Sequence, residues 1–208
     1  NWTEVNNLNT AKALLMGCGT QTAALAFGGR LDPSPSGINE TETWNGTNWT
    51  EVNNLNIARK ALAGCGTNTQ ALAFGGDTPP SSAKTELWNG TNWSQVNDLN
   101  LARKYLGGAG NSASALAFGG APGHKNETEL WNGTNWTEVN NLNQNRDLLS
   151  GAGINTTEIL AFGGEDSLGS TELWNGTNWT GQHSLSVGRG RASPNTSTGP
   201  SAIAAGGI

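Results

Sequence analysis

The stretch "WNGTNWTEVNNLN" occupies residues 44–56, and the same thirteen letters return unchanged at residues 131–143. Near-copies stand at 88–100 (WNGTNWSQVNDLN) and at 174–186 (WNGTNWTGQHSLS), and the chain opens inside the phrase with NWTEVNNLN. Self-similarity at a fixed period is the sequence signature of a repeat architecture. The phrase therefore marks one structural unit, and its period decides the fold.

The unit is about 44 residues long. Its central tryptophan recurs at spacings of 47, 44, 43 and 43 residues, at Trp2, Trp49, Trp93, Trp136 and Trp179. A short apolar run that ends in two glycines keeps the same period, with ends at Gly29, Gly76, Gly120, Gly164 and Gly207. We therefore divide a single domain, 1–208, into five units: 1–52, 53–96, 97–139, 140–182 and 183–208, the last completed by 1–9.

Each unit predicts four short strands. Within 59–97, the runs RKALAGCG, QALAFGG, TELW and WSQV are separated by turns or by a variable loop. None of these runs is long enough for an amphipathic helix, and glycine recurs too often for one. The Asn-Gly pair between the last two runs indicates a type I′ hairpin, whose two central residues both have positive φ. Four antiparallel strands repeated every 40–50 residues are typical of a β-propeller blade.

The order of these elements resembles the kelch repeat. In the second unit the match comprises Arg59, Gly75-Gly76, Glu86-Leu87-Trp88 and Trp93, and equivalents in the other units cover essentially the whole chain. Trp88 stands where the family usually has tyrosine. The resemblance implies a propeller of four-stranded blades, and the five units of the sequence predict an all-β, five-bladed one. The abundance of asparagine and tryptophan is also similar to kelch-type repeats encoded by tailed phages and aquatic microbes.

Closure of the expected ring depends on the two ends of the chain. The fifth blade would take its first two strands from the C-terminal unit and its fourth from Asn1–Val5, but the sequence holds no fifth TELW strand. We expect a closed monomeric ring, one strand short in its last blade, with residues 1–5 docked beside 201–208. A piece of a longer repeat array is the alternative.

Three sets of side chains recur with the period and have an expected structural role. Trp49, Trp93, Trp136 and Trp179 should be buried between strands or blades, since large aromatic side chains fill such spaces; sugar stacking is the alternative. A buried arginine is tolerable only when it is paired, and a carboxylate suits its planar fork. The kelch resemblance implies that these ionic groups lie between blades, and we expect them to form ion pairs there, with binding of an anion on the axis as the alternative. The cations are Lys12, Arg59, Arg103, Arg146 and Arg189, and the anions are Glu42, Glu86, Glu129 and Glu172.

Composition and spacing argue against several functions. The net charge is -5 and only 13% of residues are charged, without the basic stripe that nucleic acid requires. No apolar run approaches the roughly 18–20 residues of a membrane span. His124 and His183 lie in non-equivalent parts of their units, and no spacing of ligands predicts a metal site. We expect neither cofactor nor enzymatic activity, because no catalytic arrangement is recognisable.

The two cysteines occupy equivalent positions, Cys18 and Cys65, where other units have Ala109 and Ala152. A position that accepts cysteine or alanine requires a small apolar side chain. A disulfide between them is possible in principle, but an even cysteine count alone does not establish it.

The loop after the double glycine is the variable part of the unit. It reads RLDPSPSGINET, DTPPSSAKT, APGHKNET and EDSLGST in the first four units. Loops on a rigid scaffold commonly carry binding specificity. We expect contacts to a protein or glycan partner from Asp32, Asp77, His124, Lys125, Glu165 and Asp166. Solvated loop tips without a ligand are the alternative for each of these residues.

The function expected from these features is that of a non-catalytic binding or structural module, such as a virion or extracellular adhesion component. The alternative is a lectin with repeated weak glycan sites between its blades. A hydrolase or oxidase is disfavoured, because the sequence lacks the required arrangement of catalytic residues.

Overall fold

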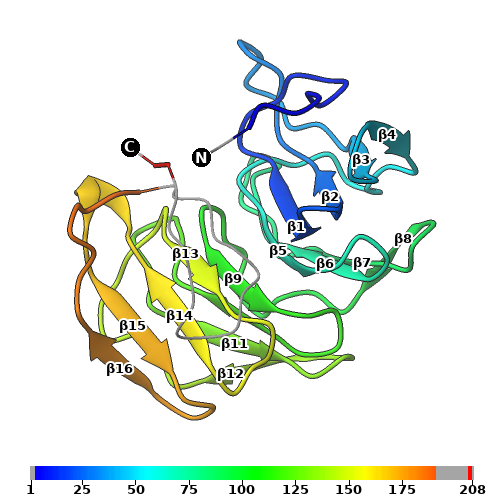
Figure 1. Cartoon of the computed structure of the whole chain (residues 1–208). Coiled ribbons are helices and arrows are strands. Elements are labelled where there is room, and N and C mark those ends of the chain that lie inside the picture. The colour runs from blue at the N-terminus through cyan, green and yellow to red at the C-terminus, as the bar shows by residue number, and fades with distance from the viewer. Residues whose placement is uncertain (1–2, 191–205, 208) are drawn as a thin grey trace.

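The computed structural model describes residues 3–190, 206 and 207. These residues form a β-propeller of four-stranded antiparallel blades, four in number. Figure 1 shows the blades arranged around a common axis. Within each blade the strands follow chain order from the axis outwards, and the inner strands contact each other in the order β1, β5, β9, β13.

The strand bounds repeat closely from blade to blade. The first blade comprises β1 (Met16–Thr20), β2 (Ala23–Phe27), β3 (Thr41–Trp44) and β4 (Trp49–Val52). The second comprises β5 (Ala63–Gly66), β6 (Ala71–Phe74), β7 (Thr85–Trp88) and β8 (Trp93–Val96). The third comprises β9 (Gly107–Gly110), β10 (Ala115–Phe118), β11 (Thr128–Trp131) and β12 (Trp136–Val139). The fourth comprises β13 (Ser150–Ala152), β14 (Ile159–Phe162), β15 (Thr171–Trp174) and β16 (Trp179–Gln182).

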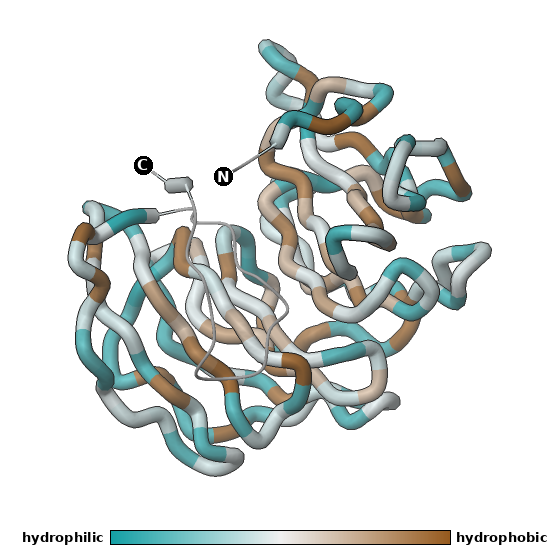
Figure 2. Tube along the Cα trace, in the orientation of Figure 1, coloured by the Kyte–Doolittle hydropathy of each residue, from teal (hydrophilic) through white to brown (hydrophobic). Residues whose placement is uncertain are grey.

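Helix is almost absent from the described part of the chain. A single turn of 3-10 helix, η1 (Glu165–Ser167), follows β14. In the described residues, no helix has the length and apolar character needed to cross a membrane. Figure 2 shows hydrophobic residues along the strands of the blades and hydrophilic residues in many of the connecting loops.

The predicted number of five blades is wrong for the described residues, which form four. Residues 3–5, expected as the outer strand of a fifth blade, form no strand. The physical reason is that the fifth unit has no TELW strand, so residues 3–5 lack the antiparallel neighbour that a fourth strand requires. The expected first two strands of that blade, in 191–205, lie outside the described residues, as does most of the contact expected between 1–5 and 201–208.

The fifth unit nevertheless repeats one contact of the complete units. Arg189 Nη1 donates to the carbonyl of Gly206 at 2.8 Å, as Arg59 Nη1 donates to the carbonyl of Gly75 at 3.1 Å. Gly206 and Gly75 have nearly equal φ angles of 68° and 66°. The double glycine near the end of the chain therefore has the local geometry of its counterparts.

Neighbouring blades are joined by an aromatic contact that explains the glycines of the inner strands. The ring of Phe74 on β6 lies 4.9 Å from that of Trp136 on β12 of the next blade, measured between centroids. Trp136 Nε1 also donates to Thr85 Oγ1 at 3.0 Å. A Cβ atom on Gly108 of β9 would lie 2.6 Å from Phe74 Cζ, closer than real Cβ contacts. Glycine is thus required where the phenylalanine of one blade meets the inner strand of the next.

Burial of the repeated tryptophans follows from this contact. Trp93, Trp136 and Trp179 are each 5% exposed, which confirms their expected burial and leaves no ring face for a sugar. Trp49 is partly exposed. Trp49 belongs to the first blade, which would follow the fifth unit around the expected ring. In that unit the sequence has Ala205 where the others have phenylalanine.

The NGTN turn is a four-residue loop between the paired residues Trp44 and Trp49. The backbone N–H of Asn45 donates to the carbonyl of Asn48 at 3.3 Å, and Asn45 Oδ1 accepts from the N–H of Asn48 at 2.9 Å. Gly46 has φ of 93°, whereas Asn45 has no positive φ. The predicted type I′ turn is therefore wrong, because that turn needs a two-residue loop with both residues at positive φ.

The asparagines of the NNLN stretch join successive blades. Asn53 Nδ2 donates to the carbonyl of Thr91 at 3.1 Å and to Asn92 Oδ1 at 2.8 Å, both in the next blade. Asn56 Nδ2 donates to Glu86 Oε2 at 2.8 Å and to the carbonyl of Trp93 at 3.0 Å. The same two roles recur at Asn97 with Asn100 and at Asn140 with Asn143. The phrase repeats because each copy must fit the copy in the next blade.

Candidate functional site

Four of the five periodic cations form buried ion pairs with the periodic carboxylates, which confirms the pairing expected for them. Their N–O distances are 2.9 Å for Lys12–Glu42, 3.1 Å for Arg59–Glu86, 2.9 Å for Arg103–Glu129 and 3.0 Å for Arg146–Glu172. The fifth cation, Arg189, donates instead to the carbonyl of Gly206. Burial lowers the pKa of Arg103, and the charge of Glu129 acts against that shift. Arg103 Nη1 also donates to the carbonyls of Gly119 and Glu127. These paired groups are not available to an anion on the axis, so that alternative is wrong for them.

The inner strands line an open, mainly apolar cavity of about 540 Å³. Four leucines from equivalent positions contribute to its wall: Leu15, Leu62, Leu106 and Leu149. Among the described residues its lining includes no charged side chain.

The variable loops lie at one end of the blades. Antiparallel order places the loop between the second and third strands at the same end as the linker into the next blade. The other end holds the two short turns of each blade, where Trp88 Nε1 donates to the carbonyl of Asn68 at 2.9 Å. We call the end formed by the variable loops the loop face; it comprises residues 28–40, 75–84, 119–127 and 163–170.

Two of the expected contact residues are engaged in local ion pairs on this face. Asp32 has a side chain that is 69% exposed and lies 2.6 Å from Arg30. Asp77 is buried between Lys60 at 3.7 Å and Lys104 at 3.4 Å. Asp32 is thus accessible to a partner, whereas Asp77 links the second blade to the third.

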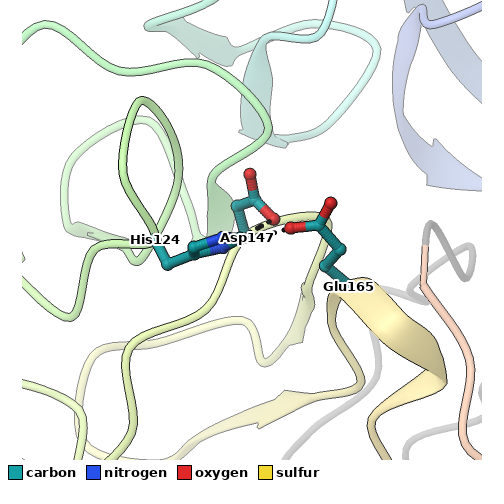
Figure 3. Close-up of side chains that lie close together, drawn as sticks. All are labelled: His124, Asp147 and Glu165. Atoms are coloured by element: carbon teal, nitrogen blue, oxygen red, sulfur yellow. Dashed lines mark ion pairs between the residues drawn. The ribbon is translucent and has the colours of Figure 1, made fainter.

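Two other expected contact residues, His124 and Glu165, meet at the junction of the third and fourth blades. His124 Nδ1 lies 3.1 Å from Glu165 Oε2 and 3.6 Å from Asp147 Oδ1 (Figure 3). His124 belongs to the loop between β10 and β11, Asp147 to the linker before β13, and Glu165 begins η1. One ligand atom from each residue lies within 4.8 Å of the other two, so the group could hold a metal ion.

Exposure differs among these three side chains. Those of His124 and Glu165 are 57% and 41% exposed, whereas Asp147 as a residue is only 7% exposed. The nearby charge of Asp147 is the main cause that raises the pKa of Glu165. The arrangement therefore places two carboxylates close together beside one imidazole, open to solvent on the side of His124 and Glu165.

The remaining expected residues lie next to this group along the chain. The backbone N–H of Lys125 donates to the carbonyl of Gly120 at 2.8 Å. Asp166 is exposed and has φ of 56° within η1. Neither side chain belongs to the potential metal-binding group.

Asp147 was not among the expected site residues, and ligand spacing along the chain gives no signal for the group. Its three members come from three separate loops, 23 and 18 residues apart in sequence. One signal was present in the repeat itself. The residue after the repeated arginine is Lys60 in the second unit and Lys104 in the third, but Asp147 in the fourth.

No protein-family model matches the sequence, and no curated protein is significantly similar to it. The fold and the repeats therefore define the class: a β-propeller built from internally repeated, four-stranded antiparallel blades.

Proposed function

We propose that this chain is a kelch-type, non-catalytic binding module that contacts a partner through its loop face. One observation carries the proposal: side-chain contacts of the framework repeat from blade to blade, whereas the side-chain ion pairs of the loop face do not. Specificity on a rigid scaffold commonly resides in the loops that vary.

The contrast is visible in individual contacts. The Trp–Thr bond recurs at every junction between complete blades, with lengths of 3.0–3.1 Å. On the loop face, Arg30 pairs with Asp32 in the first blade, whereas Asp77 bridges two lysines in the second. His124 pairs with Glu165 between the third and fourth. Each sector of the face therefore presents different chemistry.

A protein partner suits the described surfaces better than a glycan held between blades. The junction that a lectin site would occupy is filled by pairs such as Phe74 and Trp136, whose rings are in contact. Sugar binding generally relies on an accessible aromatic face, and of the four framework tryptophans only Trp49 is partly exposed. The loop face instead offers separate charged side chains.

The proposal is tested by finding a ligand and then mapping it to one end of the propeller. The purified chain is applied to a glycan array and to a peptide display library. Ligands are then measured against Asp32→Ala and Lys125→Ala on the loop face. The matched control is Gln70→Ala, an exposed residue at the opposite end.

The proposal predicts that at least one loop-face substitution weakens binding about tenfold, which corresponds to about 1.4 kcal/mol. Gln70→Ala should leave affinity unchanged. Equal losses at both ends, or a ligand lost only with Gln70→Ala, would contradict it. Glycan ligands that bind at the blade junctions would favour the lectin alternative.

A further inference from the structure

We propose that His124, Asp147 and Glu165 bind a divalent transition-metal ion at the junction of the third and fourth blades. This inference goes beyond the proposed function and does not depend on it, because it requires only these three side chains. Four features carry it: a reversal of charge within the repeat, a buried carboxylate oxygen without a donor, the ligand distances and the ligand types.

The reversal of charge appears when equivalent positions of two blades are compared. In the second blade, Lys60 and Asp77 exchange backbone hydrogen bonds, and their side chains form an ion pair at 3.7 Å. In the fourth blade, the N–H of Glu165 donates to the carbonyl of Asp147 at 3.0 Å. The same backbone contact thus brings a carboxylate to a carboxylate where the second blade has an amine. The two carboxylates have oxygen atoms within 4.8 Å of each other, where like charges repel, and a cation between them would replace the missing lysine.

The second feature is the state of Asp147 itself. Its Oδ1 atom is buried and has no hydrogen-bond partner within the part of the chain that the structure describes. Its nearest cationic candidate, His124 Nδ1, is 3.6 Å away, beyond hydrogen-bond length. Figure 3 shows this carboxylate next to both the imidazole of His124 and the carboxylate of Glu165. A buried acceptor without a donor is rare in folded proteins, and a bound cation would satisfy it.

The distances between the ligand atoms suit a small metal ion. Zinc bonds to histidine nitrogen and carboxylate oxygen at about 2.0–2.2 Å, so ligands in a tetrahedral site lie roughly 3.3–3.6 Å apart. The separations from His124 Nδ1 are 3.1 Å to Glu165 and 3.6 Å to Asp147. Small side-chain movements would therefore complete the coordination.

The ligand types select the class of ion. An imidazole nitrogen suits zinc, copper, iron and nickel, whereas magnesium and calcium favour sites made of oxygen alone. Three protein ligands leave a fourth position to solvent or to a group from a partner. The exposed sides of His124 and Glu165 would give such a group access.

The test is a titration of the full chain, without a polyhistidine tag, with Zn²⁺ by calorimetry and with Co²⁺ by visible absorption. The expected result is saturable binding of one ion per chain. His124→Ala, Asp147→Asn and Glu165→Gln should each weaken it at least about tenfold, in line with losses of other metal-site groups. His183→Ala is the matched control, since His183 is the only other histidine in the sequence, and it should bind like the wild type.

A further variant keeps the test independent of folding defects. Asp147→Lys places an amine opposite Glu165, as Lys60 lies opposite Asp77 in the second blade. It should lose metal binding while the melting temperature of the metal-free protein stays equal or rises. The absence of saturable binding would overturn the proposal. So would binding that survives all three ligand substitutions, or binding lost with His183→Ala.

Discussion

Trp93 Nε1 in the second blade donates to Thr41 Oγ1 in the first at 3.1 Å, and the ring of Trp93 also packs against Phe27 of that blade. The bond is buried, and each later junction between complete blades repeats it. One tryptophan per blade thus joins hydrophobic packing to a satisfied polar group. This relationship explains why the central tryptophan of the repeated phrase recurs with the period.

The loss of stability on replacing this tryptophan should depend on which blade carries it. Trp93→Ala should lower the free energy of unfolding by about 3–5 kcal/mol, since it leaves a cavity between two blades. Trp49→Ala should cost clearly less, because Trp49 is already partly exposed. Denaturant unfolding followed by circular dichroism measures both values. Equal losses would show that the inter-blade contact is not the source of the stability.

Breaking a buried ion pair should lower the free energy of unfolding far more than breaking an exposed one. Arg103→Ala leaves the Glu129 carboxylate buried without its partner, which should cost about 3–5 kcal/mol. The control is Lys84→Ala, which breaks a 2.8 Å pair with Asp98 whose side chains are 47% and 35% exposed. That change should cost under about 1 kcal/mol. Similar losses in the two variants would argue against a structural role for the buried pair.

The cysteines should be unreactive in the folded protein. Both are free and buried, and burial raises the pKa of Cys18 to about 12 and also raises that of Cys65. Because the thiolate is the reactive form, iodoacetamide at about pH 8 should modify neither residue without denaturant and both with it. Mass spectrometry counts the modified thiols. Rapid labelling of the native protein would contradict their burial.

Stability should fall in acid partly through Glu42. Burial alone would raise the pKa of Glu42, but the hydrogen bond from Lys12 and that from the N–H of Asn9, at 2.7 Å, outweigh it and lower the pKa below 4.5. The folded state therefore binds this proton less readily than the unfolded state. Its contribution is present above pH 4.5 and is lost as the pH falls through the lower, folded value.

The Glu42→Gln variant isolates that contribution. It should be less stable than the wild type near neutral pH, because Lys12 loses its carboxylate. The difference in unfolding free energy should shrink as the pH falls below 4.5, and pH-dependent denaturant titrations measure it. A difference that stays constant with pH would exclude this linkage.

The repeat made much of the framework predictable. The common period of Arg59 and Glu86 with their counterparts predicted the ion pairs, and the four short runs within each unit predicted the four-stranded blades. For the described residues the number of blades was overestimated, because a count of tryptophans includes Trp2 although its unit has no TELW sequence for a third strand. Periodicity shows what recurs, but a complete blade also needs every strand of the unit.

The candidate site was predictable only in part. His124 and Glu165 were found because they stand in loops that vary between units, but nothing local relates either residue to Asp147. The close packing of successive blades brings these three residues together. That packing arises from contacts such as the one between Phe118 and Trp179. Sites of this kind depend on the packing of whole blades rather than on a motif.

We propose that repeated positions hold the propeller together and that departures from the repeat carry binding. Anomalous diffraction from crystals grown with Zn²⁺, measured at the zinc edge, tests it most directly at the fourth blade. We predict one strong peak about 2.0–2.2 Å from His124 Nδ1 and from carboxylate oxygens of Asp147 and Glu165. A map with no peak between these residues, or with its strongest peak elsewhere on the chain, would contradict the claim.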